Sequence, residues 1–322
     1  MTMSNSWTDY WSSGVLDSCP EHSSLYTEFF CSFWLSELKR MSDSRNNIKI
    51  LDIATGNGVV PLFFVKNISK DMTKLDIIGI DKAKISPQKF RNYLINKDHS
   101  VNFISNTSAE IMPFVNNEFD WIVSQFGIEY SIIEKSLVEA IRVLKHSGRW
   151  TFVCHFENSE IIVKNKEVLE CSNQLLSHWP IFNLTLERVF LEKQMLENQT
   201  ESNKNKLRKV EVRVSSIISS MLNSNEHKKN YFKNVINASN QIYVESKSMS
   251  FADVKSRVDF AIDALKNSIQ RLFELDSAAM VSDRLGIFEK IIKQEGGDIE
   301  KIRKMKHQGR YVAIELSGVK NS

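Results

Sequence analysis

The stretch "KILDIATGNGVVPLFF", residues 49–64, decides the fold. An apolar run is followed by a turn with Gly56 and Gly58 and then by a second apolar run. The first run is typical of a buried strand, and the second of a helix, because Pro61 would lie in its first turn, where proline is tolerated. Glycine lets a turn adopt left-handed angles and lets a ligand come close to the backbone. A strand, a glycine turn and a helix in this order therefore predict a ligand site.

Strands and helices continue to alternate after this stretch. Further strands are expected at residues 74–81, 101–106, 119–126 and 149–156, and further helices at residues 86–97 and 133–147. Strands that alternate with helices favour a parallel sheet with helices on both faces. We therefore expect an α/β fold with a Rossmann-like, doubly wound, mostly parallel sheet and a large helical insertion before the last strand.

The remaining segments differ from this region in composition and in apolar pattern. Residues 1–47 are rich in aromatic side chains and are expected to form an N-terminal helical lid segment, with an amphipathic helix from Tyr26. Residues 156–306 lose the strand pattern and are expected to form a mostly helical insertion, as a substrate lid or for dimerisation. Residues 309–317 again have the apolar pattern of a strand, so residues 48–155 and 307–322 would together form the Rossmann-like core domain.

Composition narrows the class of protein. The 322 residues carry a net charge of +3, which does not call for a nucleic acid partner. The N-terminus lacks the pattern of a secretory signal, and no apolar run is long enough to span a membrane. The four cysteines are widely spaced without a CxxC pair, which favours reduced thiols over disulfides or a metal site. A cytoplasmic protein with no metal is expected.

The acid at the end of the second strand points to a nucleoside ligand. Asp81 follows that strand, where a carboxylate accepts hydrogen bonds from ribose hydroxyls. The third glycine of a dinucleotide site is missing after Gly58, and no GKS or GKT motif is present. Asp52, just ahead of the turn, would repel a pyrophosphate but suits an ammonium group. S-adenosylmethionine has an ammonium, a sulfonium and a ribose, and no phosphate.

Five motifs in order resemble those of the class I S-adenosylmethionine-dependent methyltransferases. They are "ILDIATGNGVVPL", "IIGID", "SAEIMPF" (108–114), "FDWIVSQFGIEY" (119–130) and "AIRVLKHSGRWTFVCH" (140–155). The resemblance implies S-adenosylmethionine as cofactor and S-adenosylhomocysteine as product. It covers the core between residues 50 and 155 and the last strand.

The resemblance also implies residue roles. The glycine turn would lie under the methionine and ribose parts of the cofactor, and Asp52 would lie near its amino group. Asp81 would bind the ribose hydroxyls, and the stretch after residue 107 would lie along the adenine. The residues expected to bind the cofactor are Asp52, Ala54, Thr55, Gly56, Asn57, Gly58, Asp81, Lys82, Ser108, Ala109, Glu110, Ser124, Gln125, Phe126, Tyr10 and Trp11. Ala54 replaces a common glycine, and Ser108 stands where an aspartate usually accepts from the adenine amino group.

Three residues are candidates for the acceptor side. His155 ends the fifth strand and has a side chain suited to general base catalysis, although a buried histidine can also be only hydrogen-bonded. Glu129 and Tyr130 follow the fourth strand, with a helix-capping acid and a packing aromatic as the alternative interpretation. The "WTDYW" segment, which contains Tyr10 and Trp11, is expected either to cover the cofactor or to anchor the N-terminal helix in the core.

The sequence therefore predicts an S-adenosylmethionine-dependent methyltransferase that acts on a small organic molecule, with O-, N- or C-methylation left open. The alternatives are a protein or RNA methyltransferase that docks through the insertion, and a non-catalytic binding protein with the same fold. A nicotinamide oxidoreductase is disfavoured by the glycine spacing. A small-molecule substrate is the expected partner, and neither a membrane nor a nucleic acid is favoured. A homodimer through the insertion is a further alternative.

Overall fold

A computed structural model describes residues 5–16, 23–43, 47–67, 74–87 and 99–322 of the chain. The chain divides into two compact units, Met1–Val163 with Glu274–Ser322, and Lys164–Phe273. The first unit holds every strand of the described ranges, and the second is helical.

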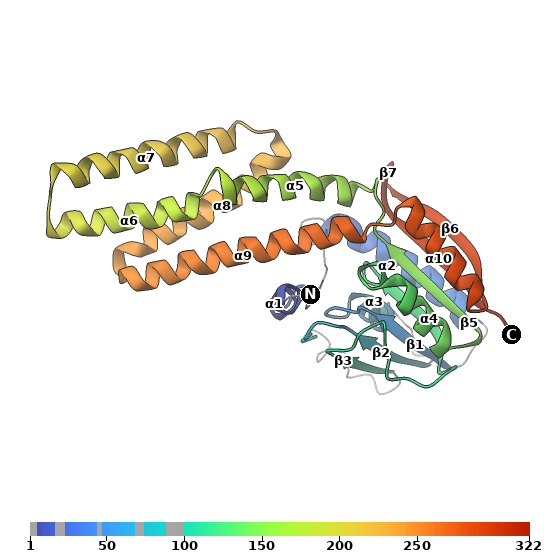
Figure 1. The fold of residues 1–322 in the computed structure, drawn as a ribbon. Helices are drawn as coiled ribbons and strands as arrows, with labels where there is room; N and C mark the ends of the chain where they lie inside the picture. The colour runs from blue at the N-terminus through green and yellow to red at the C-terminus, as the bar shows by residue number, and fades with distance from the viewer. Residues whose placement is uncertain (1–4, 17–22, 44–46, 68–73, 88–98) are drawn as a thin grey trace. The chain divides into compact units, whose positions relative to one another are not determined.

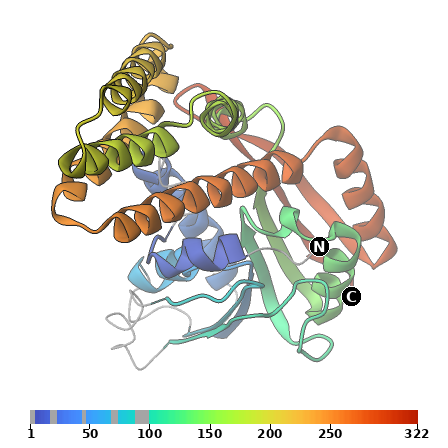
Figure 2. The same ribbon diagram turned by 60° about the vertical axis from the view of Figure 1, so that its left-hand side comes forward.

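The sheet of the first unit has seven strands in the order β3-β2-β1-β4-β5-β7-β6 (Figures 1 and 2). Its strands are β1 (Asn47–Ile53), β2 (Lys74–Ile80), β3 (Ser100–Ile104), β4 (Phe119–Gln125), β5 (Leu144–Cys154), β6 (Gly297–His307) and β7 (Arg310–Lys320). β1 to β5 run parallel, whereas β7 is antiparallel to both of its neighbours. The prediction of a doubly wound, mostly parallel sheet is confirmed.

Helices cover both faces of the sheet. α2 (Ser23–Ser42) and α3 (Val59–Asn67) share one hydrophobic cluster with β1 and β2, and α4 (Ile133–Val143) and α10 (Ser282–Gln294) share another with β4 and β5. Two short elements complete this unit, α1 (Asn5–Ser12) and the 3-10 helix η2 (Ile128–Tyr130). The helix predicted at 86–97 falls mainly on residues outside the described ranges.

The second unit contains α6 (Ile181–Glu197), α7 (Glu201–Leu222), α8 (Glu226–Glu245) and η3 (Ser246–Ser248), with most of α5 (Glu160–Ser177) and α9 (Phe251–Ala278). These helices share one hydrophobic cluster. Ser250 caps the start of α9, because its Oγ accepts from Asp253 N at 3.2 Å and donates to Asp253 Oδ2 at 2.6 Å.

The prediction that residues 156–306 lack strands is wrong at its end, since β6 lies at Gly297–His307. β6 is an edge strand whose side chains are mostly exposed or half-exposed, so it lacks the apolar alternation of a half-buried strand. A tight turn joins it to β7 through Gln308 (φ 46°) and Gly309 (φ 82°), both in the left-handed region that a two-residue hairpin requires.

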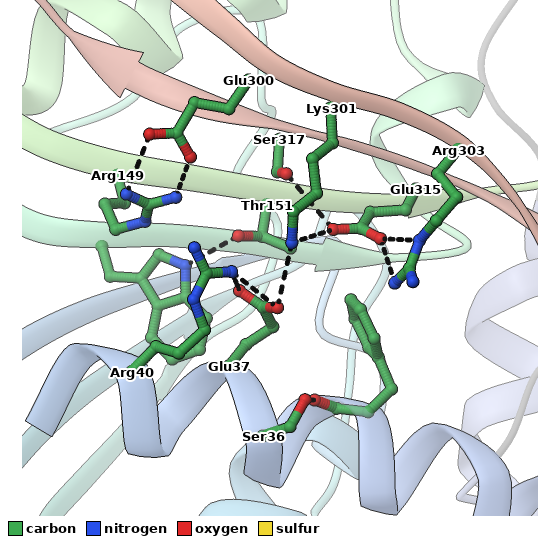
Figure 3. A network of polar contacts seen from close by, with 12 residues as sticks. Ser36, Glu37, Arg40, Arg149, Thr151, Glu300, Lys301, Arg303, Glu315 and Ser317 are labelled. Atoms are coloured by element: carbon green, nitrogen blue, oxygen red, sulfur yellow. Dashed lines mark hydrogen bonds and ion pairs between the residues drawn. The ribbon is translucent and has the colours of Figure 1, made fainter.

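A network of charges joins α2 to this edge of the sheet (Figure 3). Glu315 of β7 is fully buried, and its carboxylate accepts from Arg303 Nε at 2.8 Å. Lys301 Nζ lies 3.4 Å from Glu315 and 3.6 Å from Glu37 of α2, which also pairs with Arg40 at 2.9 Å. The cations of β6 and α2 thus neutralise two buried carboxylates, and we call these five residues the sheet-edge network.

Candidate functional site

The glycine turn between β1 and α3 is held in left-handed conformations. Ala54, Gly56 and Gly58 have φ values of 54°, 54° and 85°. At Gly56 a side chain is excluded twice, by this angle and because a Cβ would lie 2.6 Å from Trp11. The glycine therefore makes room for an indole of α1 as well as for the turn.

Asp81 follows β2 and fastens the turn. Its Oδ2 accepts from Gly56 N and its Oδ1 from Ala83 N, both at 2.8 Å. Burial raises the pKa of Asp81 to about 6, although both backbone hydrogen bonds favour the charged form. Each carboxylate oxygen keeps a lone pair for a further donor, and the residue lines a cavity.

Asp52 lies at the end of β1, behind the turn. It is almost fully buried, and its Oδ2 accepts from Thr55 Oγ1 at 2.6 Å. Burial raises its pKa to about 7, the Thr55 hydrogen bond opposes this shift, and the Asp81 charge adds to it. Asp52 and Thr55 therefore support the turn from behind rather than line the cavity.

The cavity beside the turn has a volume of about 270 Å³. Its wall is formed by the turn, the residues after β2, the segment 106–110, the residues after β4 and one side of α1. The lining residues are Trp7, Thr8, Trp11, Ala54, Asp81, Lys82, Ala83, Asn106, Thr107, Ser108, Ala109, Glu110, Phe126, Gly127, Tyr130 and Ser131.

Aromatic rings from α1 form one side of the cavity. Trp7 stacks on Trp11 with 6.0 Å between centroids and meets Tyr130 edge-on at 5.6 Å. Trp7 Nε1 donates to Glu274 Oε2 at 2.7 Å. Asn57 Nδ2 donates to Trp11 O at 2.9 Å and also to Val15 O, so Asn57 anchors the end of α1 to the glycine turn. Within this group, the indoles and the phenol ring form an apolar wall.

The segment after β3 carries a second carboxylate. Ser108 Oγ donates to Glu110 Oε2, while Glu110 Oε1 accepts from Ile132 N at 3.0 Å. Lys82 Nζ lies 3.8 Å from Glu110 Oε2. Glu110 is therefore engaged with its own wall, and the Ser108 hydroxyl is turned toward it.

Phe126, His155 and Glu129 lie at the carboxyl ends of β4 and β5. The Phe126 ring stacks on the His155 imidazole with centroids 4.1 Å apart and an interplanar angle of 9°. Glu129 Oε1 accepts from His155 N at 2.9 Å. Burial raises the pKa of Glu129 to about 7 and lowers that of His155 to about 3.

Two residues of β4 face away from the cavity. Ser124 Oγ donates to Ile53 O at 2.8 Å and accepts from Ile128 N, so it joins β1 to η2. Gln125 Oε1 accepts from Trp34 Nε1 at 2.6 Å, which ties β4 to α2.

The residues predicted from the sequence fall into two groups. Those that line the cavity are Trp11, Ala54, Asp81, Lys82, Ser108, Ala109, Glu110, Phe126 and Tyr130. Those that support it without lining it are Asp52, Thr55, Gly56, Asn57, Gly58, Ser124, Gln125, Tyr10, Glu129 and His155. Trp7, which was expected as part of the WTDYW segment either to cover the cofactor or to anchor the helix, also lines the cavity, and its spacing of four from Trp11 places both indoles on one side of a helix.

The lining fits a cationic nucleoside better than a phosphate ester. Asp81 and Glu110 are carboxylates, and the cationic side chain among the lining residues, Lys82, lies close to Glu110. Four aromatic rings complete the wall, and aromatic faces attract cations. A sulfonium beside a ribose matches these groups, whereas a pyrophosphate would meet negative charge.

The strand order with its antiparallel β7, the glycine turn and the acid after β2 agree with the fold that the resemblance to the class I methyltransferases predicts. The chain is similar to the class I S-adenosylmethionine-dependent methyltransferases, whose cofactor is S-adenosylmethionine. Within this class, residues 29–175 match the model of the ubiE/COQ5 methyltransferase family.

Curated relatives match the same part of the chain. It is 33% identical over 111 residues to the ubiquinone/menaquinone biosynthesis C-methyltransferase UbiE of Rickettsia typhi, over 34% of this chain and 44% of that protein. It is 29% identical over 119 residues to the protein of the same name from Blochmanniella floridana, over 36% of this chain and 45% of the relative. The chain thus spans less than half the length of these relatives.

Among solved structures, the chain is similar to a putative S-adenosyl-L-methionine-dependent methyltransferase from Methanococcus maripaludis. The TM-score is 0.43 with 12% identity, over 94% of this chain and 90% of that one. No helix in the described ranges combines the length and apolar character needed to cross a membrane.

Proposed function

We propose that the protein transfers the methyl group of S-adenosylmethionine to a carbon atom of a small organic molecule with an electron-rich ring. The observation that carries this proposal is the cavity, which joins the Asp81 carboxylate to the rings of Trp7, Trp11 and Tyr130. The names of the relatives, which are C-methyltransferases of quinone biosynthesis, support a carbon acceptor and a quinone-like ring.

The residues of the chain would act by binding and alignment. Asp81 is held by two backbone N–H groups and would accept from the ribose hydroxyls with its remaining lone pairs. The cofactor, when bound, supplies a methyl group already activated on a positive sulfur. Trp7, Trp11 and Tyr130 would exclude water and favour the positive charge. Alignment of two reactants in this way lowers a barrier by about 7–11 kcal/mol.

The size of the cavity favours a small acceptor. At about 270 Å³ it lies just below the range of small-molecule sites, which is roughly 300–1,000 Å³. A nucleoside with an amino acid tail would occupy most of this space, so the acceptor is proposed to be a single ring system. The three described free thiols, Cys31, Cys154 and Cys171, agree with a proposed cytoplasmic location.

A non-catalytic binding protein is the second candidate. Ser108 favours it, because its hydroxyl is turned to Glu110 and replaces the aspartate that usually accepts from the adenine amino group. A docking or dimerisation role for the helices of Lys164–Phe273 remains a prediction from the sequence.

Calorimetric titration with S-adenosylmethionine and S-adenosylhomocysteine tests the proposal. We expect micromolar binding by the wild type and at least tenfold weaker binding by Asp81→Ala, since hydrogen bonds to a charged group contribute about 1.5–3 kcal/mol. Asp76→Ala is the matched control, because Asp76 lies on β2 at the opposite end from the cavity. Absence of binding by the wild type would exclude the enzyme and favour the binding protein.

A further inference from the structure

His155 is a buried base whose ring lacks hydrogen-bonding partners. Its side chain is fully buried, and within the described residues neither Nδ1 nor Nε2 has a hydrogen-bond partner. Its backbone is well held, because His155 N donates to Glu129 Oε1 at 2.9 Å and Met280 N donates to His155 O at 2.8 Å. Burial keeps the imidazole neutral by lowering its pKa to about 3. The position is therefore rigid, while a basic lone pair is left unused.

A single ring separates this base from the cavity. Phe126 lines the cavity and lies parallel to the imidazole at 4.1 Å. Phe126 has a φ of 53°, a left-handed angle that is rare for a bulky residue and that marks strain at functional sites. Tyr130, which also lines the cavity, meets the imidazole edge-on at 6.2 Å. Aromatic rings of the cavity wall thus cover His155.

Packing alone does not account for this arrangement. A leucine or phenylalanine at position 155 would fill the space without burying unpaired polar atoms, whose burial is unfavourable. The cavity is also small for a cofactor together with an acceptor ring, so a movement of part of its wall would make room for both. Phe126 is the wall residue that has both a strained backbone and a base behind it.

We propose that His155 is the proton acceptor of the methyl transfer and that the Phe126 ring is its cover, which turns aside when the acceptor ring enters. This inference rests on the proposed function, because it takes an electron-rich ring as the acceptor. The acceptor ring would take the place of the Phe126 side chain and direct the proton of its reacting carbon toward the nitrogen edge of the imidazole.

The step balances without another reagent. The bond between methyl carbon and sulfur breaks and its electron pair stays on sulfur, while a π pair of the ring forms the new carbon–carbon bond. The ring carbon then loses its proton to a nitrogen of His155, which restores aromaticity. The Glu129 carboxylate beside His155 N would stabilise the imidazolium, and Arg284, which donates to Glu129 O at 2.6 Å, holds Glu129 in place. The proton leaves to water when the cavity opens.

Access to His155 is tested on the full chain with diethyl pyrocarbonate, with modified histidines located by mass spectrometry. In the wild type we expect His155 to react at least tenfold more slowly than the exposed His146. In Phe126→Ala the two rates should come within threefold of each other. Phe126→Leu, which keeps more of the packing, should give an intermediate rate, and circular dichroism checks that both variants are folded. Equal rates in the wild type, or continued protection in folded Phe126→Ala, would overturn the cover.

The role as proton acceptor is tested by transfer of tritiated methyl from S-adenosylmethionine to hydroquinone. We expect His155→Asn to lower kcat at least 100-fold, in keeping with the general range for acid–base catalysis. With His155→Asn, ring-deuterated hydroquinone should react at least twofold more slowly than ordinary hydroquinone, because loss of the ring proton becomes the rate-limiting step in this variant. His146→Asn is the matched control and should keep wild-type turnover. His155→Asn with turnover within threefold of the wild type would refute the role.

The two proposals fail differently. Lack of cofactor binding in the calorimetric titration removes the methyltransferase itself. Cofactor binding without any turnover of hydroquinone removes the acceptor class and, with it, this role of His155. The labelling rates report on the Phe126 cover in either case.

Discussion

The first unit buries two groups of carboxylates in opposite ways. At the sheet edge, Glu315 and Glu37 lie beside Arg303, Lys301 and Arg40 (Figure 3). At the glycine turn, Asp52 and Asp81 are hydrogen-bonded by a hydroxyl and by backbone N–H groups, with no ion pair to a cationic side chain among the described residues. The first group is neutralised by the protein, whereas the second is held ready for a positive ligand.

This difference separates structure from function. A buried acid that has cationic partners remains charged and fixes one arrangement of α2 on the sheet. A buried acid without them has a raised pKa, as Asp52 and Asp81 do, and this is a marker of functional sites when the group lies at a cavity. The two groups should therefore respond differently to mutation and to pH.

Removal of a cation from the sheet-edge network should have the largest effect on stability. We expect Arg303→Ala to lower the free energy of unfolding by about 2–3 kcal/mol, because Glu315 is fully buried and, among the described residues, Lys301 would be the one cation left to pair with it. Urea unfolding followed by tryptophan fluorescence measures this. Lys145→Ala, which breaks a pair with Asp120 at the surface, should cost less than about 1 kcal/mol. Equal losses of unfolding free energy in the two variants would contradict a special role for the buried Glu315 pair.

Ionisation of Asp52, behind the glycine turn, should have the next largest effect on stability. Burial raises the pKa of Asp52 from 3.8 to about 7, so between these values the folded state holds a proton that the unfolded chain has released. The free energy of unfolding should therefore fall as the pH rises through this window and level off above it. Asp52→Asn removes this contribution and should flatten the pH dependence by about 2 kcal/mol between roughly pH 5.5 and 7.5.

Urea unfolding of wild type and Asp52→Asn at a series of pH values measures the difference. Comparison of the two proteins cancels the titration of groups that they share. Parallel curves would show that Asp52 ionises normally and that the turn resembles the sheet edge.

The smallest effect is expected on cofactor binding, at the adenine side of the cavity. Ser108→Asp should bind S-adenosylhomocysteine about 3- to 10-fold more tightly, because it adds a carboxylate that can accept from the adenine amino group. Calorimetry measures this, with Ser108→Ala as the matched control that removes the hydroxyl without adding charge. Weaker binding by Ser108→Asp would mean that repulsion from Glu110 dominates at this wall.

The apolar pattern was enough to predict the sheet core and the turn. The buried strands β1, β2 and β4 lie where their apolar runs predict them, since a strand buried on both faces carries a continuous signal. β5 overlaps the strand predicted at 149–156 but begins at Leu144, because the helix predicted to reach residue 147 ends at Val143. β6 was missed because its charged side chains serve the sheet-edge network and the surface. Its turn at Gln308 and Gly309 was the local signal available.

The candidate site was predicted less completely. Asp81 and Glu110 were named from their motifs and line the cavity. Trp7 was expected only as part of the WTDYW segment, with two alternative roles, and it lines the cavity. Asn57 anchors α1 by hydrogen bonds to backbone oxygens, which no motif predicted. Such contacts join residues about 45 positions apart, so no local pattern encodes them.

By itself, the sequence determined that a glycine turn follows a buried strand and that an acid ends the next one, because apolar periodicity and glycine act over a few residues. Only the tertiary structure decided which side chains face the cavity and which stand behind it. His155 behind Phe126 is the clearest case. Burial and partners, which set the pKa of a group and its access to a ligand, arise from packing between distant segments of the chain.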